Sequence, residues 1–250
     1  MFLEASWKAP AHIRAVTTLR EGGVSEGPLA SLNLGLHVGD DPARVAANRQ
    51  RVAQTLGWTH SPLWLNQVHG THVVEASTQQ DGTSPPEADG AVTSLVHRPL
   101  AVMTADCLPV VFCDRAGTRV GIAHAGWRGL LNGVLESAVQ KADRRPSEMM
   151  AWIGPGIGPD SYQVGSEIRE AFVQSNEEHR GDFQAGGHGK WLFDLASAAV
   201  HRLKRMGVTD VAVSPYDTFA EPGRFFSHRR ESLKNPGSTC GRQATFIWIA

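Results

Sequence analysis

Cysteine is scarce in this chain, and no long apolar run is present. Its three cysteines, Cys107, Cys113 and Cys240, are too few for a disulfide framework, and their odd number favours a reducing compartment. The most apolar stretch, residues 99–113, is interrupted by polar residues and proline, and it falls short of the roughly 20 residues that a membrane span needs. The N-terminus lacks the basic start and the apolar core of a secretory signal. We therefore expect a cytoplasmic protein with no membrane partner.

A dominant charge is missing as well. The 250 residues carry 24 basic and 25 acidic side chains, a net charge of -1, so no overall field would hold the protein on nucleic acid. With 41% hydrophobic and 20% charged residues, the composition is typical of a soluble globular protein. No repeat or composition break divides the chain, which predicts one domain over residues 1–250. The sequence does not determine the oligomeric state, and a monomer is the simplest expectation.

Runs rich in Val, Ile and Leu cluster instead of alternating with helices, which predicts an α+β fold with a mixed sheet. The expected strands are 13–19, 63–68, 71–76, 100–103, 108–113, 120–124, 151–154, 208–214 and 244–249. The expected helices are 42–56, 130–139, 166–174 and 194–206. Residues 77–87 and 176–190 are polar or glycine-rich and are expected to be surface loops.

The helix 42–56 has the clearest boundaries. Asp41 is a suitable N-cap, Pro42 suits the first helical position, and Gly57 suits the end. Arg49 falls on the apolar, inward face of this helix. A buried guanidinium needs an anionic partner, and the sequence leaves open whether that partner is a carboxylate of the protein or a bound substrate.

His69, Cys107 and His124 come at the ends of predicted strands. Imidazole and thiolate are preferred zinc donors, and three protein ligands leave the fourth tetrahedral position open, as in catalytic sites. The same residues also allow two other interpretations. The histidines could be ordinary surface or hydrogen-bonded residues around a core cysteine. Alternatively, the Cys107 thiolate could be a nucleophile activated by His124, with Asp106 or another polar group orienting the imidazole.

Two further segments suggest binding functions. The glycine-rich run 154–158 lacks the Lys and Ser/Thr of a phosphate-binding loop, so we expect a simple turn. The segment 225–230, with the sequence Phe-Phe-Ser-His-Arg-Arg, is either a strand that directs alternate side chains into a pocket or a solvated basic edge. We assign Cys113 and Cys240 to packing.

Several strings of this sequence together resemble those of the YfiH/YlmD family, which is also called the polyphenol oxidoreductase or laccase-domain family. They follow the family's order from about residue 14 to residue 244. The strings are Ser31-Leu32-Asn33-Leu34, His37-Val38-Gly39-Asp40-Asp41, Asn48-Arg49, Asn66-Gln67-Val68-His69-Gly70, Ala105-Asp106-Cys107-Leu108-Pro109, His124-Ala125-Gly126-Trp127-Arg128-Gly129, Ile153-Gly154-Pro155-Gly156-Ile157 and Gly241-Arg242-Gln243-Ala244.

The resemblance implies a single-domain, mixed-sheet α/β sandwich of the YfiH type, related to cysteine hydrolases. It also implies a zinc ion held by a histidine, a cysteine and a second histidine. The matching positions here are His69, Cys107 and His124, which are then the catalytic and metal-binding residues.

The activity implied by the resemblance is that of a purine nucleoside phosphorylase. Family members act on adenosine, inosine, guanosine and methylthioadenosine with phosphate, and they deaminate adenosine. Zinc would assist the deamination by lowering the pKa of bound water to about 7. Asn33, Arg49 and Arg229 lie in family motifs and are the expected contacts of phosphate or nucleoside.

Three alternatives to this activity remain. The first is an amidase-type hydrolase that uses Cys107 and His124 on a cell-wall precursor. The second is a copper-dependent polyphenol oxidase, although the 11 histidines include no His-x-His pair of a multicopper centre, and copper could instead occupy the zinc site. The third is a nucleotide-binding regulator with a structural zinc. One position departs from the family: Asp217 stands where many relatives have cysteine.

Overall fold

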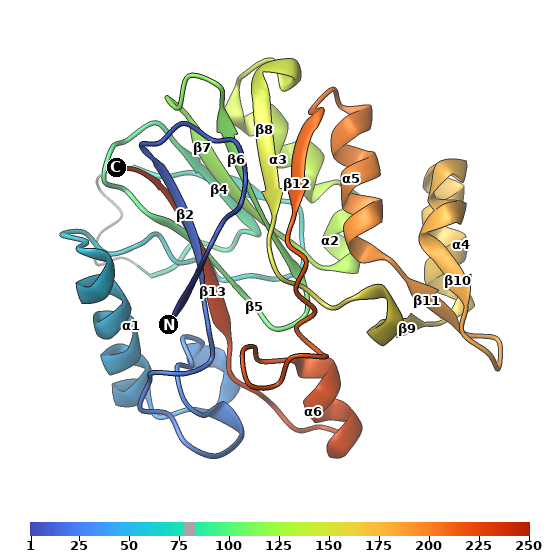
Figure 1. Cartoon of the computed structure of the whole chain (residues 1–250), viewed down its shortest axis with the longest axis horizontal. Coiled ribbons are helices and arrows are strands. Elements are labelled where there is room, and N and C mark those ends of the chain that lie inside the picture. The colour runs from blue at the N-terminus through green and yellow to red at the C-terminus, as the bar shows by residue number, and fades with distance from the viewer. Residues whose placement is uncertain (78–83) are drawn as a thin grey trace.

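Two β-sheets stack face to face, and helices cover their outer surfaces (Figure 1). The structure is a computed structural model, and it describes residues 1–77 and 84–250. The larger sheet runs in the order β12 (Asp210–Val213), β8 (Met149–Ile153), β6 (Leu108–Asp114), β7 (Val120–Ala125), β4 (Gly90–Thr93) and β3 (Val73–Glu75). The smaller sheet runs in the order β1 (Phe2–Glu4), β2 (Ile13–Thr18), β13 (Gln243–Ile249) and β5 (Leu100–Thr104). The larger sheet is mixed, because β12 pairs parallel with β8 and β3 pairs parallel with β4.

The helices and a small third sheet complete the fold. The helices are α1 (Pro42–Leu56), α2 (Trp127–Asn132), α3 (Val134–Ala142), α4 (Ser166–Ser175), α5 (Leu195–Arg205) and α6 (His228–Lys234). The third sheet has the order β10 (Phe183–Ala185), β11 (Trp191–Phe193) and β9 (Gln163–Val164), and it lies beside α4 (Figure 1). Short 3-10 helices are Gly27–Leu29, Leu36–Val38, Pro146–Glu148, Pro159–Ser161 and Glu177–Asp182.

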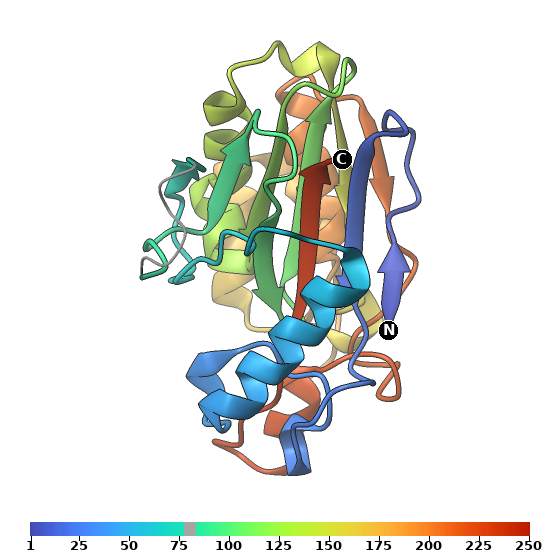
Figure 2. The same ribbon diagram turned by 90° about the vertical axis from the view of Figure 1, so that its left-hand side faces the viewer.

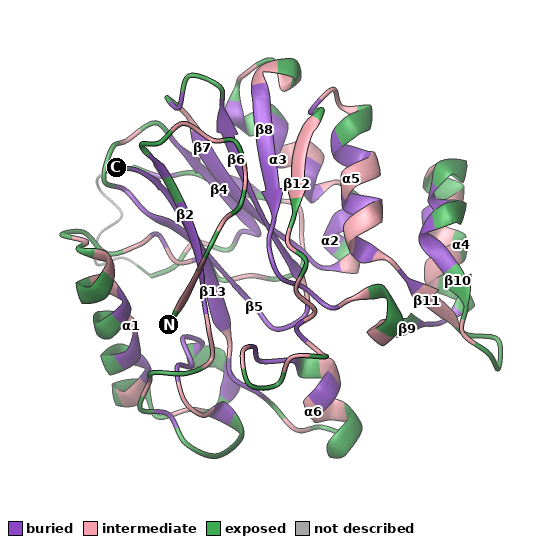
Figure 3. Cartoon of the chain, in the orientation of Figure 1, coloured by how far each residue is buried: buried purple, intermediate pink, exposed green. Residues whose placement is uncertain are grey.

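Each central strand contributes to two cores, because successive side chains point to opposite faces of a sheet. In β6, Val110 and Phe112 face the helices α3 and α5, whereas Val111 and Cys113 face the smaller sheet. In the smaller sheet, Phe246 of β13 faces outward and packs in a third cluster beneath α1. Figures 2 and 3 show this layered arrangement and the buried strands at its centre. The expected α/β sandwich with a mixed sheet is confirmed.

Helix α1 follows the local signals of the sequence. The Asp41 carboxylate accepts a hydrogen bond from the Ala43 amide at 2.8 Å, and the helix ends at Gly57, whose φ of 68° is left-handed. The expected strands at 13–19, 100–103, 108–113, 120–124 and 244–249 are also present within a residue or two. In the part of the chain that the structure describes, no helix is long and apolar enough to cross a membrane.

Some expected elements are wrong. Residues 63–68 do not form a strand but make isolated bridges at Leu63 and Asn66, and residues 71–76 contain only the short β3. The helix expected at 130–139 begins earlier, at Trp127, and a left-handed Gly133 divides it into α2 and α3. Residues 78–83 of the expected loop 77–87 lie outside the described residues.

The segment 225–230 is neither of the two structures expected for it. Phe225 and Phe226 are fully buried, and the chain then turns into α6. The hydroxyl of Ser227 caps this helix by accepting a hydrogen bond from the Arg230 amide at 3.1 Å. The apolar pair suggested a strand, but the serine cap determines the local structure.

Candidate functional site

The antiparallel pairing of β6 and β7 brings Cys107 and His124 together. Leu108 pairs with Ala125 and Pro109 pairs with His124, so Cys107, which directly precedes β6, lies at the end of β7. Asp106 has a φ of 100°, and this left-handed residue turns the chain between β5 and β6. The 16 residues between Cys107 and His124 therefore form a hairpin that places His124 beside Cys107.

His69 reaches the same place from a loop organised by one buried carboxylate. The backbone amides of Val68, His69 and Gly70 all donate to Asp89, at 3.1, 3.0 and 2.7 Å. These bonds hold His69 in a left-handed conformation with a φ of 60°. Asp89 has no exposed surface and directly precedes β4, the strand that pairs with β7. Asp89 thus fixes the loop of His69 beside β7, the strand that carries His124.

The three donor groups converge. The Cys107 Sγ lies 3.9 Å from the His69 Nε2, the two imidazole rings are 4.7 Å apart at their centroids, and the donor atoms of all three residues lie within 4.8 Å of one another. Donor atoms of a tetrahedral zinc, with bonds of about 2.0–2.3 Å, are separated by roughly 3.5 Å. The group therefore fits such an ion after small side-chain movements. His124 is buried whereas His69 is exposed, so one side of the site is open to solvent.

Asp89 also orients His124. Its Oδ1 lies 2.8 Å from the His124 Nδ1, which leaves Nε2 as the donor of that ring. Burial opposes ionisation of Asp89, but the hydrogen bond and charge of His124 and the backbone amides lower the pKa of this carboxyl. Sequence reasoning expected Asp106 or another polar group in this role, and the structure assigns it to Asp89. The Asp106 carboxylate instead accepts hydrogen bonds from Thr218 and from the Arg229 amide, at 2.8 and 2.7 Å.

The three cysteines differ in their ionisation. Burial would raise the pKa of the Cys107 thiol, but the His124 and His69 imidazoles lower it to about 6. Burial raises the pKa of Cys113 to about 12 and also raises that of Cys240. Both of these thiols are buried in apolar clusters, as expected from their assignment to packing. Only Cys107 therefore has the thiolate character of a metal ligand or nucleophile.

Gly126 keeps the site open. A Cβ atom at this position would lie 2.9 Å from the Cys107 Sγ and 3.0 Å from the His69 Cδ2. Any other residue would therefore push these side chains apart. Gly126 directly precedes α2, and its backbone lies so close to both donor side chains that only a residue without a side chain fits here.

Arg49 lies near His37 and has no carboxylate partner in the described residues. Its guanidinium donates twice to the Leu34 carbonyl, at 3.0 and 2.8 Å, and stacks on Trp64 at 3.8 Å from the ring centroid. Burial lowers the pKa of Arg49 to about 10. The same side chain, together with Arg242, adds to burial in lowering the pKa of His37. The carboxylate partner that the sequence left open is thus absent from the described part of the chain.

Arg229 lies on the other side of the site. Its Nη1 donates to the Gln163 carbonyl at 2.8 Å, and its guanidinium lies 5.2 Å from the centre of the Tyr162 ring. Burial raises the pKa of Tyr162, as does the nearby Cys107 charge, whereas Arg229 opposes this shift. Burial and the charge of Arg242 lower the pKa of His228. The structure therefore brings Arg229 near the three donors.

Asn33 occupies a different position from the arginines. It has no exposed surface, and its side chain bonds to both backbone groups of Gly35, to Asp40 and to the Arg242 amide. This side chain joins the 30s loop to the segment before β13. In this arrangement it supports the segment that bears Arg242, and its contact with phosphate or nucleoside stays a prediction.

Asp217, which stands where many relatives have cysteine, forms hydrogen bonds within the protein. Its carboxylate accepts hydrogen bonds from Ser161 at 2.7 Å and from the Phe219 amide at 2.8 Å. It is not part of either donor group that could hold a metal in the described residues. The expected turn at 154–158 lies nearby, and the Ile157 amide donates to the Asp106 carbonyl.

Sequence reasoning missed Asp89, and it did not assign roles to His37, Tyr162, His228 and Arg242. A weak signal existed for two of them, because His37 and Arg242 lie in the strings that carry the family resemblance. Asp89 had no such signal. Its importance comes from four hydrogen bonds that only the folded chain brings together.

The protein is thus an α+β sandwich with a His–Cys–His group that could hold a metal ion and that is open to solvent on one side. A family model described as "Multi-copper polyphenol oxidoreductase laccase" matches residues 14–250. A Pseudomonas aeruginosa protein named purine nucleoside phosphorylase is 44% identical over 99% of this chain and 98% of the relative. The Escherichia coli protein named purine nucleoside phosphorylase YfiH is 42% identical over 97% of this chain and 96% of the relative.

A solved structure leads to the same family. The crystal structure of a Neisseria meningitidis protein superposes with a TM-score of 0.92 at 45% identity, covering 99% of this chain and 98% of that one. The chain belongs to the YfiH family of laccase-domain proteins, and the resemblance expected from its motifs is confirmed. The names of the relatives support an enzyme.

Proposed function

We propose that the chain is a zinc-dependent purine nucleoside phosphorylase formed by one domain, residues 1–250. It converts adenosine, inosine, guanosine or methylthioadenosine and phosphate into the free base and a ribose 1-phosphate, and it also deaminates adenosine. It acts in the cytoplasm as a monomer, with small molecules as its only partners. The observation that carries this proposal is the convergence of His69, Cys107 and His124. Arg49, Arg229 and Arg242 lie in the surroundings of this group and lack carboxylate partners among the described residues.

The arginines support phosphate as a substrate. Arg49 and Arg242 lie on the His37 side, and Arg229 lies on the Tyr162 side. None of the three forms an ion pair with the residues outside 78–83. Hydrogen bonds from a guanidinium to a phosphate oxygen are charge-assisted and about twice as strong as neutral ones. A phosphate could therefore bind here without displacing a carboxylate of the protein.

The donor set supports zinc and also admits copper. One thiolate and two imidazoles suit either ion, so metal analysis must distinguish them. When bound, the ion would supply a Lewis acid with one free coordination position. The chain's own contribution is to hold the thiolate of Cys107 and to direct the His124 Nε2 through Asp89.

Phosphorolysis requires the phosphate and the nucleoside to be bound next to each other in the same site. A phosphate oxygen forms a bond to C1′ of the ribose, the C1′–N9 bond breaks, and the purine leaves with the electron pair. The arginines would hold the phosphate in position for this attack, and the Tyr162 ring would form one wall of the substrate site. Deamination of adenosine uses a different bond, at C6, and needs water instead of phosphate.

The decisive experiment separates products from adenosine, inosine, guanosine and methylthioadenosine by chromatography, each with and without phosphate. We expect free base only with phosphate, and inosine from adenosine in either condition. Cys107→Ala should abolish both reactions. Full activity of Cys107→Ala, or of His124→Ala, without bound metal would contradict the proposal.

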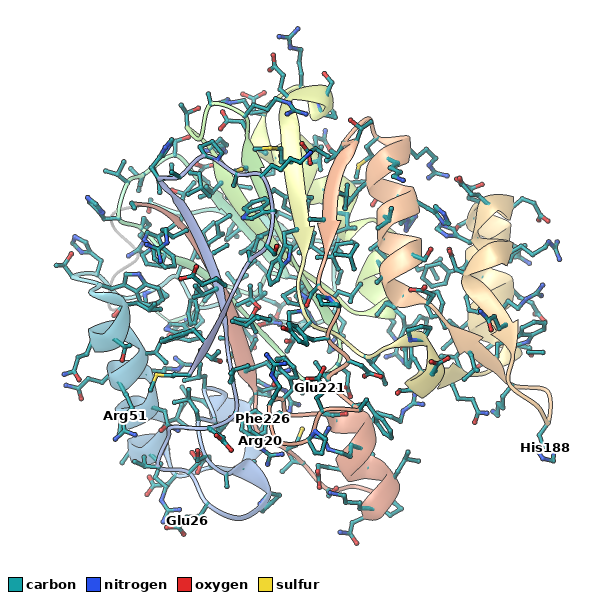
Figure 4. The ribbon with its side chains drawn as sticks, viewed as in Figure 1. Arg20, Glu26, Arg51, His188, Glu221 and Phe226 are labelled. Carbon is teal, nitrogen blue, oxygen red and sulfur yellow. The ribbon has the colours of Figure 1, made fainter. Side chains whose placement is uncertain are left out.

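Two arginines of helix α1 provide a matched test of phosphate binding. Arg49 faces inward, where it stacks on Trp64 and donates to the Leu34 carbonyl. Arg51 lies at the exposed surface of the helix, where it donates to the Gly22 carbonyl (Figure 4). We expect Arg49→Gln to raise the KM for phosphate about tenfold or more, which corresponds to about 1.4 kcal/mol. Arg51→Gln should leave this KM unchanged. Equal effects of the two substitutions would show that Arg49 acts only on stability.

A specific observation also favours the amidase alternative. Cys107, His124 and Asp89 form a chain in which a thiol of lowered pKa lies next to an imidazole oriented by a carboxylate. This arrangement is typical of a cysteine nucleophile. The alternative predicts activity that survives chelation and a covalent adduct with a thiol-directed substrate analogue. Zinc-dependent phosphorolysis predicts loss of activity with chelator and recovery with zinc.

The remaining alternatives give different outcomes in the same assays. A copper-dependent polyphenol oxidase would contain copper after purification without added copper and would oxidise phenols. A nucleotide-binding regulator would bind nucleosides tightly in calorimetry without converting them.

A further inference from the structure

A second cluster of metal-binding residues lies away from the site described above. His179 and Asp182 belong to the 3-10 helix Glu177–Asp182, and His201 belongs to α5. Their donor atoms all lie within 4.8 Å of one another. None of these elements contributes a residue to the His69–Cys107–His124 group. We propose that His179, Asp182 and His201 bind a second divalent cation of the zinc type.

The spacing of the donor atoms fits such an ion. The His179 Nδ1 lies 2.7 Å from Asp182 Oδ2, and the His201 Nδ1 lies 3.1 Å from Asp182 Oδ1. Donors of a tetrahedral zinc with bonds of about 2.0–2.2 Å are separated by roughly 3.3 Å. Both imidazoles therefore already face the carboxylate at close to the required distance.

One oxygen of the Asp182 carboxylate lacks a hydrogen bond among the described residues. Its side chain is 1% exposed, and no lysine or arginine among the described residues forms an ion pair with it. Oδ2 takes part in hydrogen bonds with both imidazoles, the second at 3.3 Å. The buried Oδ1 lies 3.1 Å from the His201 Nδ1 but accepts no hydrogen bond from the described residues. A buried carboxylate oxygen without a hydrogen bond is costly, and a bound ion is one of the ordinary explanations. A cation between the three residues would satisfy Oδ1 directly.

Two of the three residues are enclosed by the protein, and the third is partly open to solvent. The His179 side chain is 1% exposed, and its ring packs edge-on against Phe172 of α4, with the centroids 5.4 Å apart. His201 is 29% exposed, so a water molecule could complete the coordination from the solvent side. Both rings would bind as neutral imidazoles, with Nδ1 as the donor and the proton on Nε2.

The ion would strengthen a connection that hydrogen bonds already make between two parts of the chain. It would connect the 3-10 helix to α5, and the Asp194 amide at the start of α5 already donates to the Asp182 carbonyl at 2.8 Å. Phe172 also packs on Phe193, which stacks on Tyr162 in the wall of the first site. We therefore expect a structural ion that stabilises the region of α4, α5 and β9–β11.

Counting bound zinc tests the proposal in the full chain. Protein stripped with chelator is dialysed against zinc buffered at roughly nanomolar free concentration, and bound metal is measured by mass spectrometry. We expect two ions in the unaltered protein, one in Cys107→Ala and none in Cys107→Ala/His201→Ala. His188, at the tip of the loop between β10 and β11, provides the control (Figure 4). Cys107→Ala/His188→Ala should retain one ion.

Two further measurements exclude misfolding and surface binding. Cobalt added to Cys107→Ala should give d–d absorption without a thiolate-to-metal charge-transfer band. Zinc at about 100 times its Kd should raise the Tm of Cys107→Ala by roughly 5–10 °C and should not change that of Cys107→Ala/His201→Ala. An unchanged circular dichroism spectrum verifies that the double variant is folded, and Asp182→Asn repeats the test at the second ligand. The proposal is overturned if Cys107→Ala binds no zinc, or if its ion survives His201→Ala and Asp182→Asn.

Discussion

Replacing Asp89 by asparagine removes the group that joins all parts of the His69–Cys107–His124 site. Oδ1 of Asp89 accepts from the His69 amide and lies against the His124 Nδ1, and Oδ2 accepts from the amides of Val68 and Gly70. An asparagine offers one acceptor oxygen and one NH2 group that can only donate. With the NH2 group at the Oδ2 position, the Val68 and Gly70 amides lose their acceptor. With the NH2 group at the Oδ1 position, the His69 amide loses its acceptor, and His124 keeps a bond only by accepting through Nδ1, which places its proton on Nε2.

The magnitude follows from burial. Asp89 has no exposed surface, so water cannot replace the lost acceptor. Each buried donor left unsatisfied costs about 1–3 kcal/mol, and one or two donors are lost, so we expect the free energy of unfolding to fall by about 1–6 kcal/mol. Loss of the carboxylate that orients a metal-binding histidine typically costs about 10–100-fold in metal affinity. Asp89→Asn should therefore weaken both the fold and zinc binding.

Urea denaturation of metal-free protein measures the first effect, and competition with a chromophoric chelator measures the second. Asp217→Asn is the matched control, because the Asp217 carboxylate also accepts hydrogen bonds, from the Ser161 hydroxyl and the Phe219 amide, but lies outside the donor group. It should leave zinc affinity unchanged. Zinc affinity of Asp89→Asn within twofold of the unaltered protein would refute the role assigned to Asp89.

Three further predictions follow from other residues. Gly126→Ala should lower zinc affinity, measured by chelator competition, because its Cβ would lie 2.9 Å from the Cys107 Sγ; an unchanged affinity would show that the backbone can move away. Asp41→Ala should lower the free energy of unfolding by about 1 kcal/mol in urea denaturation, because the cap of α1 is lost, whereas Arg51→Gln should change it little. Burial opposes ionisation of Asp114, but hydrogen bonds from Thr118, Arg119 and Arg144 lower the pKa of this carboxyl. Its contribution to stability is therefore present above the unfolded pKa of about 3.9 and is lost as the pH falls through the lower folded pKa, so Asp114→Asn should flatten the acid limb of a stability–pH profile.

The elements with strong local signals could be predicted from the sequence. Helix α1 has a cap, a proline and a terminal glycine at the right positions, and β6 and β13 are long apolar runs buried on both faces. Residues 63–68 looked equally apolar, and Leu63 and Leu65 are indeed buried. They do not form a strand. The side-chain amide of Gln67 bonds to both backbone groups of Met103, in the place where a neighbouring strand would otherwise pair.

The site could be predicted only in part. The family motifs indicated His69, Cys107 and His124, whereas the gaps of 38 and 17 residues between them gave no local signature. The hairpin of β6 and β7 explains the second gap, because antiparallel register returns His124 to Cys107. The first gap depends on Asp89, which holds the His69 loop against β4. Such contacts between distant residues have no periodic pattern in a sequence.

The distribution of charge around the site gives the proposed function its physical basis. Two carboxylates near the donors do not pair with the arginine side chains: Asp89 binds backbone amides and His124, and Asp106 binds Thr218 and the Arg229 amide. The guanidinium groups of Arg49 and Arg229 instead donate to backbone carbonyls, which carry no net charge. Their positive charge therefore remains available at the edge of the site. An anionic substrate such as phosphate gains this attraction without breaking an ion pair of the folded protein.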